Sequence, residues 1–155
     1  MKSLNTQYKN EDGAVIVVVL LILVIITLSG VATVNTSISE KQIAAGDHFQ
    51  KVAFYVSEAA RGYVQGSPLL YGPDNVILDA GLYYPNNDNP AETFLLSTTQ
   101  SFNGEVVYTG FSNAPRDSGY EAGIFKAHKY KMLCDGNGPR NSKSQIEAGF
   151  YRIGF

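Results

Sequence analysis

The sequence has few of the residues on which disulfide scaffolds, metal sites and active sites depend. Its 155 residues include a single cysteine, Cys134, and two histidines, His48 and His128. A lone cysteine excludes a disulfide within the chain, so we interpret Cys134 as a small packing residue. Neither histidine has companions at metal-ligand spacing, so no metal site is expected. No nucleophile–base set, glycine-rich phosphate loop or cysteine pair is present, and we predict neither an enzyme nor a bound cofactor.

Charge of either sign is also scarce. The formal net charge is −2 and the isoelectric point about 5.6, which argues against nucleic-acid binding through phosphate contacts. The segment Asn86–Asn89 offers oxygen ligands, but it lacks the spacing and the distal glutamate of a calcium loop. An ordinary polar loop is therefore the favoured interpretation of this segment.

A long uncharged segment dominates the N-terminal part of the sequence. Residues 14–26 are apolar without interruption, and no charge occurs from Ala14 until Glu40. A helix needs roughly 20 mostly apolar residues to cross a bilayer. The segment is longer than the apolar stretch of a cleavable secretory signal, and Glu11 and Asp12 stand where such signals carry bases. We therefore favour a retained transmembrane helix, with a removed signal as the alternative.

Two features extend this interpretation beyond the membrane. Lys2 and Lys9 precede the span and only Lys41 follows closely, which favours a cytoplasmic N-terminus. Past Glu40, apolar residues recur at steps of three and four from Phe49 to Val64, which predicts one apolar helical face. The pairs Asp47/Lys51 and Glu58/Arg61 have helical ion-pair spacing, and Gly62, Gly66 and Pro68 end the pattern. We expect one helix over residues 14–65.

The rest of the chain has the pattern of a small β-domain. Turn-forming stretches separate β-rich segments at residues 93–98, 105–111, 124–134 and 146–153. Asn103-Gly104 predicts a tight turn before the second segment. In the last segment Ile146, Ala148 and Phe150 alternate with more polar positions, so one face can be buried. The predicted fold is α+β, with the long helix packed on a small antiparallel sheet.

These residues together resemble a type IV pilin-like protein. The Gly13–Ala14 junction before the span resembles a class III prepilin signal, and residues 37–60 resemble the N-terminal region of PilX-type pilus assembly proteins. The matching positions of that region are Ser37, Glu40, Ala45, Gly46, Ala53, Phe54, Glu58, Ala59 and Ala60. The resemblance implies a prepilin leader (residues 1–13), an N-terminal transmembrane and assembly helix (14–65) and a periplasmic α+β domain (66–155).

The resemblance also implies roles for particular residues and partners. A prepilin peptidase would cleave between Gly13 and Ala14 and methylate the Ala14 nitrogen. Glu40 and Glu58 would be assembly contacts, although solvated helix charges are the simpler interpretation. The expected partners are the lipid bilayer, the prepilin peptidase, the inner-membrane assembly platform, the major pilin and other minor pilins. The subunit would cross the inner membrane of a Gram-negative cell once and then pass into the pilus, a fimbrium at the cell surface.

One departure from the pilin pattern concerns the fifth mature position. Many pilins carry a glutamate there, whereas this chain has Val18. A second departure lies in the leader, where the acidic pair Glu11–Asp12 stands in place of the usual base. A buried carboxylate needs a partner, which in pilins is thought to be the N-terminal amine of a neighbour. A subunit without this glutamate makes no such contact to the subunit ahead of it, which favours a place at or near the pilus tip. Two alternatives remain: a minor pseudopilin of type II secretion, and a single-pass anchored periplasmic binding domain that does not polymerise.

Overall fold

The computed structural model describes residues 12–116, 118–121 and 123–154. Its first element is one long helix, α1 (Asp12–Gly66), which confirms the helix expected over residues 14–65. The chain divides into two compact units, one that ends at Ala45 and one over Gly46–Phe155. We call the second unit the head. The upper part of α1, from Gly46, therefore belongs to the same unit as the strands.

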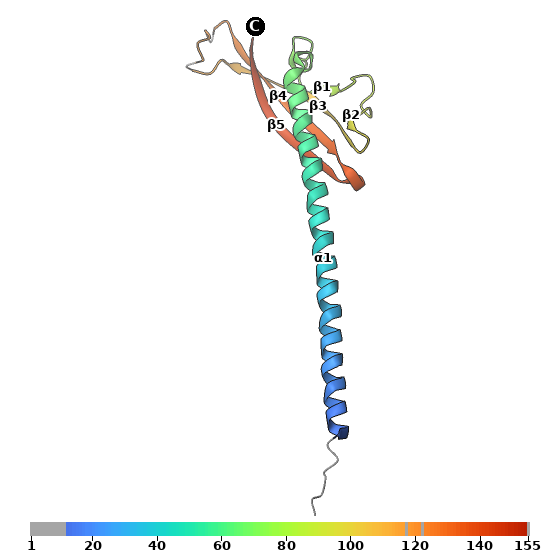
Figure 1. Cartoon of the computed structure of the whole chain (residues 1–155). Coiled ribbons are helices and arrows are strands. Elements are labelled where there is room, and N and C mark those ends of the chain that lie inside the picture. The colour runs from blue at the N-terminus through green and yellow to red at the C-terminus, as the bar shows by residue number, and fades with distance from the viewer. Residues whose placement is uncertain (1–11, 117, 122, 155) are drawn as a thin grey trace, which may run out of the picture. The chain divides into compact units, whose positions relative to one another are not determined.

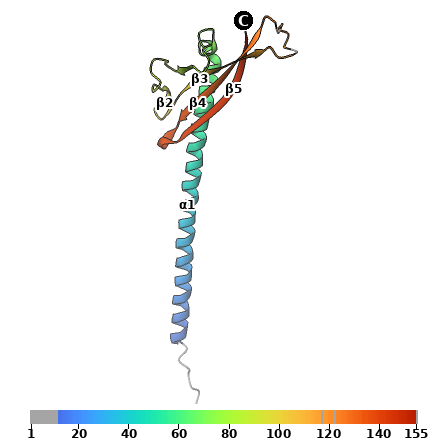
Figure 2. The same ribbon diagram turned by 180° about the vertical axis from the view of Figure 1, so that it is seen from behind.

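The head contains a five-stranded antiparallel sheet. Its strands are β1 (Gly81–Tyr84), β2 (Phe94–Ser97), β3 (Gln100–Asn113), β4 (Lys126–Asn137) and β5 (Lys143–Gly154). The order is β1-β3-β4-β5, and β2 also pairs with β3. Short 3-10 turns follow α1 (η1, Pro68–Tyr71) and join β4 to β5 (η2, Pro139–Asn141). The upper part of α1 lies in front of the sheet in Figure 1 and behind it in Figure 2, so it covers one face only.

The core of the head forms between that helix and the covered sheet face. The helix contributes Ala53, Val56, Ala60 and Val64, all buried and spaced by three or four residues, as the apolar pattern predicted. The strands contribute buried side chains from alternate positions: Tyr84, Phe102, Val106, Tyr108, Tyr130, Met132 and Cys134. Cys134 is therefore a packing residue. The α+β fold predicted from the sequence is confirmed.

Helix and sheet lie close together at Gly136. A Cβ atom there would lie 2.5 Å from both the backbone nitrogen and the Oγ of Ser57, and 2.6 Å from the carbonyl oxygen of Ala53. The Ser57 hydroxyl donates a hydrogen bond to the Ser144 carbonyl at 2.8 Å, next to Gly136 in the β4–β5 register. The glycine lets the helix backbone approach the strand closely enough for this bond.

The strands differ from the sequence-based expectation in two places. The tight turn predicted at Asn103-Gly104 is wrong, because both residues lie inside β3 and pair with Asp135 and Cys134 of β4. A Cβ atom on Gly104 would lie 2.0 Å from the Leu133 carbonyl oxygen and 2.5 Å from the Tyr84 hydroxyl. The glycine therefore serves close packing rather than a turn. Strand β1 was not predicted, since only its pairing with β3 distinguishes it from the surrounding loops.

Candidate assembly surfaces

The predicted cleavage junction lies at the start of α1. Gly13 and Ala14 belong to the first turn of the helix, and both are exposed. Apart from its chain neighbours and the helix backbone, no atom of the described residues lies within 4 Å of the Cβ position of Gly13. Residues 1–11 of the expected leader, with Glu11, lie outside the described residues. The junction is thus open to another protein.

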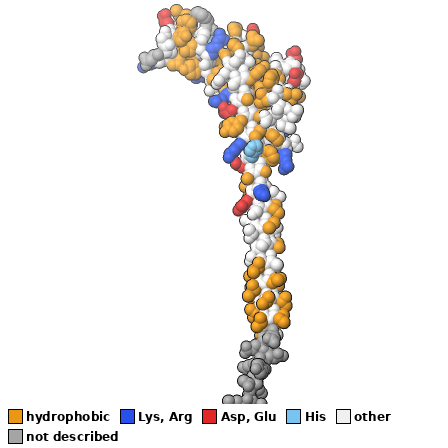
Figure 3. Space-filling view, in the orientation of Figure 1, with side chains coloured by type: hydrophobic (Ala, Val, Ile, Leu, Met, Phe, Trp, Pro, Cys, Tyr) orange, Lys and Arg blue, Asp and Glu red, His pale blue; other side chains and the backbone are white. Residues whose placement is uncertain are grey.

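Among the described residues, none covers the apolar segment of α1. Every large apolar residue from Val15 to Val34 is between 49% and 65% exposed, Val18 included. The helix is long and apolar enough to cross a membrane, and none of its most apolar stretch is buried. Figure 3 shows this apolar surface along the lower helix. Such a surface needs lipid or other apolar helices around it.

Four hydroxyl groups between Thr27 and Ser39 are hydrogen-bonded within the helix. The hydroxyls of Thr27, Thr33, Thr36 and Ser39 each donate to a backbone carbonyl three or four residues earlier, at 2.8–3.1 Å. A hydroxyl that is bonded in this way carries a smaller desolvation cost into an apolar environment. The hydroxyl-rich part of the helix can therefore enter lipid or a helix bundle.

The two glutamates with expected assembly roles have different surroundings. Glu58 is half-buried and pairs with Arg61 one turn later in its own helix. Glu40 is exposed and makes no ion pair with any described residue. The structure does not bring Glu40, Glu58 and Val18 together into one site. Glu58 is already satisfied locally, whereas the Glu40 carboxylate is available to another chain.

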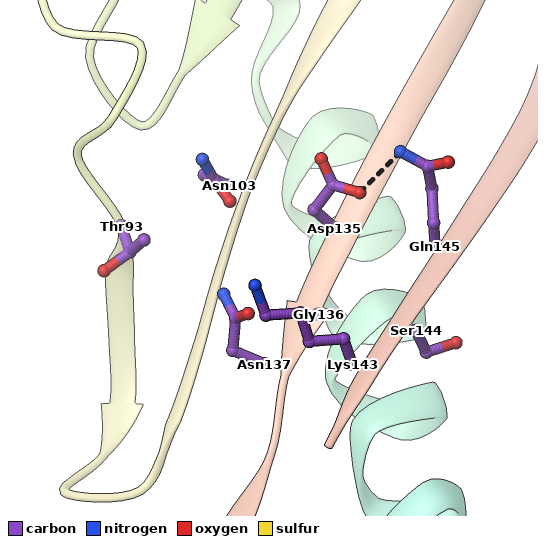
Figure 4. A pocket seen from close by; sticks show the side chains of 8 residues that line it. All are labelled: Thr93, Asn103, Asp135, Gly136, Asn137, Lys143, Ser144 and Gln145. Carbon is purple, nitrogen blue, oxygen red and sulfur yellow. Dashed lines mark hydrogen bonds between the residues drawn. The ribbon is translucent and has the colours of Figure 1, made fainter. Parts of the chain in front are cut away.

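A polar cleft of about 580 Å³ lies on the sheet face opposite α1. Figure 4 shows its lining side chains, which come from β3, β4, β5 and from Thr93, the residue before β2. Asp135 accepts a hydrogen bond from Gln145 across β4 and β5 at 2.7 Å, and Asn103 donates to the Pro90 carbonyl at 3.2 Å. Among the described residues that line it, Asp135 is the only acid and Lys143 the only base, and the two form no ion pair. The cleft therefore offers hydrogen-bonding groups to a ligand or partner.

Buried titratable groups in the core are held neutral. Burial raises the pKa of the Cys134 thiol above its ordinary value, because a low-dielectric environment disfavours the thiolate. Burial raises the pKa of the Tyr84 phenol as well, and its hydroxyl donates to the Leu133 carbonyl at 2.8 Å. Neither group is prepared for nucleophilic chemistry. No group of three or more His, Cys, Asp or Glu side chains among the described residues could hold a metal ion.

The long apolar helix followed by a small sheet is the layout of a pilin-like protein, and comparison with known families agrees. Residues 12–60 match the family model described as PilX N-terminal. The resemblance to PilX-type minor pilins is therefore confirmed over this segment, and it supports a pilin-like protein associated with the type IV pilus. That family is one of structural pilins, whose members interact with other pilus components. No curated protein and no solved structure matches the chain.

The sheet-based surfaces could not be found from the sequence. The polar cleft depends on the register that sets Asn103 opposite Asp135 and Asp135 opposite Gln145. These three residues are far apart in the sequence and form no motif. By contrast, the apolar span was visible because it is continuous.

Proposed function

We propose that this chain is a minor pilin-like subunit that acts in the initiation and assembly of a type IV pilus. The PilX N-terminal match over residues 12–60 carries the proposal. The exposed apolar helix supports it, since a helix of this kind can exchange a lipid environment for a bundle of similar helices. In this proposal the span stores the subunit in the inner membrane before it enters the filament core.

The proposed processing follows from the junction. Cleavage after Gly13 and methylation of Ala14 would leave a mature chain that begins at the apolar segment. The N-terminus would be cytoplasmic before cleavage, and residues 66–155 would form the periplasmic domain. The prepilin peptidase, the assembly platform, the major pilin and other minor pilins are the proposed partners, and Glu40 is the better placed of the two glutamates to contact one of them.

We place the subunit at or near the pilus tip because of Val18. The described helix offers no carboxylate between Gly13 and Glu40, so it lacks a partner for the N-terminal amine of another subunit. If nothing lies ahead of the subunit, then Val18→Glu gains no partner and buries a carboxylate without a counter-charge. We expect Val18→Glu to leave the number of pili per cell unchanged or lower.

The measurement is pilus number by electron microscopy, together with immunogold labelling of the wild-type subunit along filaments. Val18→Leu is the matched control, since it changes the side chain and keeps it apolar. Label along the whole shaft together with increased piliation in Val18→Glu would contradict the tip position.

Two further measurements separate the alternative functions. Sequencing of the mature N-terminus distinguishes a pilin, which begins at Ala14, from a plain membrane anchor, which keeps Met1. Deletion of the gene distinguishes the pilus from type II secretion: loss of surface pili supports the proposal, whereas loss of secreted enzymes with normal piliation indicates a pseudopilin.

A further inference from the structure

The two edges of the head sheet are protected to different degrees. One edge is divided between β1 and β2, which have four residues each, with Pro85 and Pro90 between them and a register shift between Leu95 and Ser97. Short strands, prolines and bulges are the usual devices that prevent edge-to-edge pairing. This edge therefore does not offer a continuous template to another strand.

The other edge is β5, and it has none of these devices. It runs for 12 residues without proline, and its pairing with β4 is unbroken from Lys143 to Gly154. The side chains at its even-numbered positions point toward the helix side: Ser144, Ile146, Ala148 and Phe150 are uncharged, and Arg152 near the end of the strand is charged. A long edge strand without proline or bulge, and with no inward charge before Arg152, is a template for strand addition.

The outward backbone groups of β5 can be assigned from the register. The Gly138 nitrogen donates to the Ser142 carbonyl at 2.8 Å and closes the β4–β5 hairpin. Because bonded pairs alternate along an antiparallel ladder, the backbone groups of the odd-numbered residues from Lys143 to Ile153 point away from β4. The Lys143 carbonyl confirms this direction, since it accepts a bond from Gln50 of α1 at 3.3 Å. Among the described residues, no strand pairs with the other outward positions.

An apolar cleft adjoins this edge at its C-terminal end. It has a volume of about 350 Å³ and is lined by Val64, Gln65, Tyr71, Met132, Phe150, Tyr151 and Arg152. A strand added to β5 would point alternate side chains toward the helix side, where Phe150 and Tyr71 stand edge to face with ring centroids 5.4 Å apart. One apolar side chain of the added strand would fill the cleft and set the register.

The charges of the edge indicate what kind of strand would bind. Lys143 lies at one end of β5 and Arg152 near the other, and the one acid, Glu147, is paired with Lys131 of β4 at 3.0 Å. No described acid pairs with Lys143 or Arg152, and Arg152 donates only to the Tyr71 carbonyl, at 3.2 Å. The edge therefore complements a strand that carries acidic residues near its ends.

We infer that the β5 edge is a docking site for an extended segment of another pilus component, with alternating apolar residues and terminal acids, which adds to the sheet as a further strand. This inference rests on the proposed function in the pilus. A second copy of this chain fits less well, because two edges of the same net charge would meet. If two β5 strands paired antiparallel, the two α1 helices would also enter their heads, at Gly46, from opposite ends of the joined sheet.

The test uses the full-length chain in its own cells, with a photo-reactive benzoylphenylalanine at Gln145 or at Tyr151, and mass spectrometry to map each cross-linked residue. We expect cross-links from both positions to one extended segment of one pilus component. Gly149→Pro removes an outward backbone N–H that the added strand would use, so it should lower the cross-link yield about tenfold. Gly149→Ala keeps that N–H, and its Cβ would come no closer than 3.9 Å to the Tyr130 carbonyl oxygen, so the yield should be unchanged.

A second variant guards against misfolding of Gly149→Pro, which thermal unfolding in detergent would reveal. Lys143→Glu combined with Arg152→Glu leaves the backbone intact and should lower the yield about threefold or more. Cross-links only to a second copy of this chain, no cross-links, or yields unchanged in both the proline and the charge variants would overturn the inference. Co-sedimentation of the chain with sheared pili separates this inference from the proposed function. If the cross-linking results contradict the inference while the wild-type chain still co-sediments with pili, only the docking inference fails. If the wild-type chain does not co-sediment with pili, the proposed function fails.

Discussion

The contact between Gly136 and Ser57 allows a quantitative test of how the helix is held on the sheet. Gly136→Ala adds a methyl group where the Ser57 nitrogen, the Ser57 Oγ and the Ala53 carbonyl oxygen lie within 2.6 Å. Two of these three atoms belong to the helix backbone and cannot rotate away. The upper part of α1 must therefore move off the sheet by about 1 Å, since real Cβ contacts are rarely shorter than about 3.4 Å.

The expected loss of stability has two parts. Overpacking of a tight contact costs about 1–3 kcal/mol. Loss of the hydrogen bond from Ser57 to the Ser144 carbonyl adds about 1 kcal/mol. We expect Gly136→Ala to lower the free energy of unfolding of the head by about 3 kcal/mol, which corresponds to a fall in Tm of about 10 °C for a unit of this size.

The measurement is thermal unfolding of the full-length protein in detergent micelles, followed by the near-ultraviolet circular dichroism of the tyrosines. Gly149→Ala is the matched control, because the same methyl group there meets only the Tyr130 carbonyl oxygen at 3.9 Å. Ser57→Ala should cost about 1 kcal/mol by itself. If Gly136→Ala unfolds within about 1 °C of Gly149→Ala, then the helix does not contact the sheet as described here.

Two further predictions concern processing and pH. Gly13→Leu should accumulate a slower-migrating precursor in the membrane fraction, because a side chain would crowd an extended substrate backbone in the peptidase. The control, Gly30→Leu within the span, should mature normally. Normal maturation of both variants would refute cleavage after Gly13. Because burial raises the pKa of the Cys134 thiol in the folded state, folded and unfolded chains are equally protonated below the unfolded pKa of about 8.5, and above it the unfolded chain holds fewer protons. The head should therefore lose up to about 1.4 kcal/mol per pH unit through Cys134 as the pH rises from 8.5 toward the folded pKa; in Cys134→Ala unfolding by urea should show a smaller loss between pH 8 and 10, and an equal loss in both chains would contradict the assignment.

The sequence predicted the elements that depend on local pattern. Both ends of α1 were predicted to within two residues, because the apolar period stops at Gly66 and Pro68 follows. Four of the five strands overlap the segments expected from β-rich composition. The buried helix positions were also visible, since Ala53, Val56, Ala60 and Val64 recur at helical spacing.

The sequence misled where a residue served a distant contact. Asn103-Gly104 has the chemistry of a tight turn, but Gly104 lies in β3, where Leu133 and Tyr84 leave no room for a side chain. The lining of the polar cleft and the outward groups of β5 depend on strand register, which local composition does not determine. The proposed roles of Val18 and Glu40 on the helix depend on partners outside the chain.

The difference between the two sheet edges suggests how one subunit could combine two kinds of contact. The hydrophobic effect is non-directional, so lipid or other apolar helices would cover the exposed segment Val15–Val34 equally well. In the proposed function, this segment would therefore allow transfer between the two environments without choosing a partner. Backbone hydrogen bonds along β5 are directional and fix a register. If a minor subunit starts a filament, then the head must select its neighbour, because the helix surface cannot. On this argument specificity belongs to the edge from Lys143 to Gly154, and substitutions there should change which partner is bound while leaving membrane insertion intact.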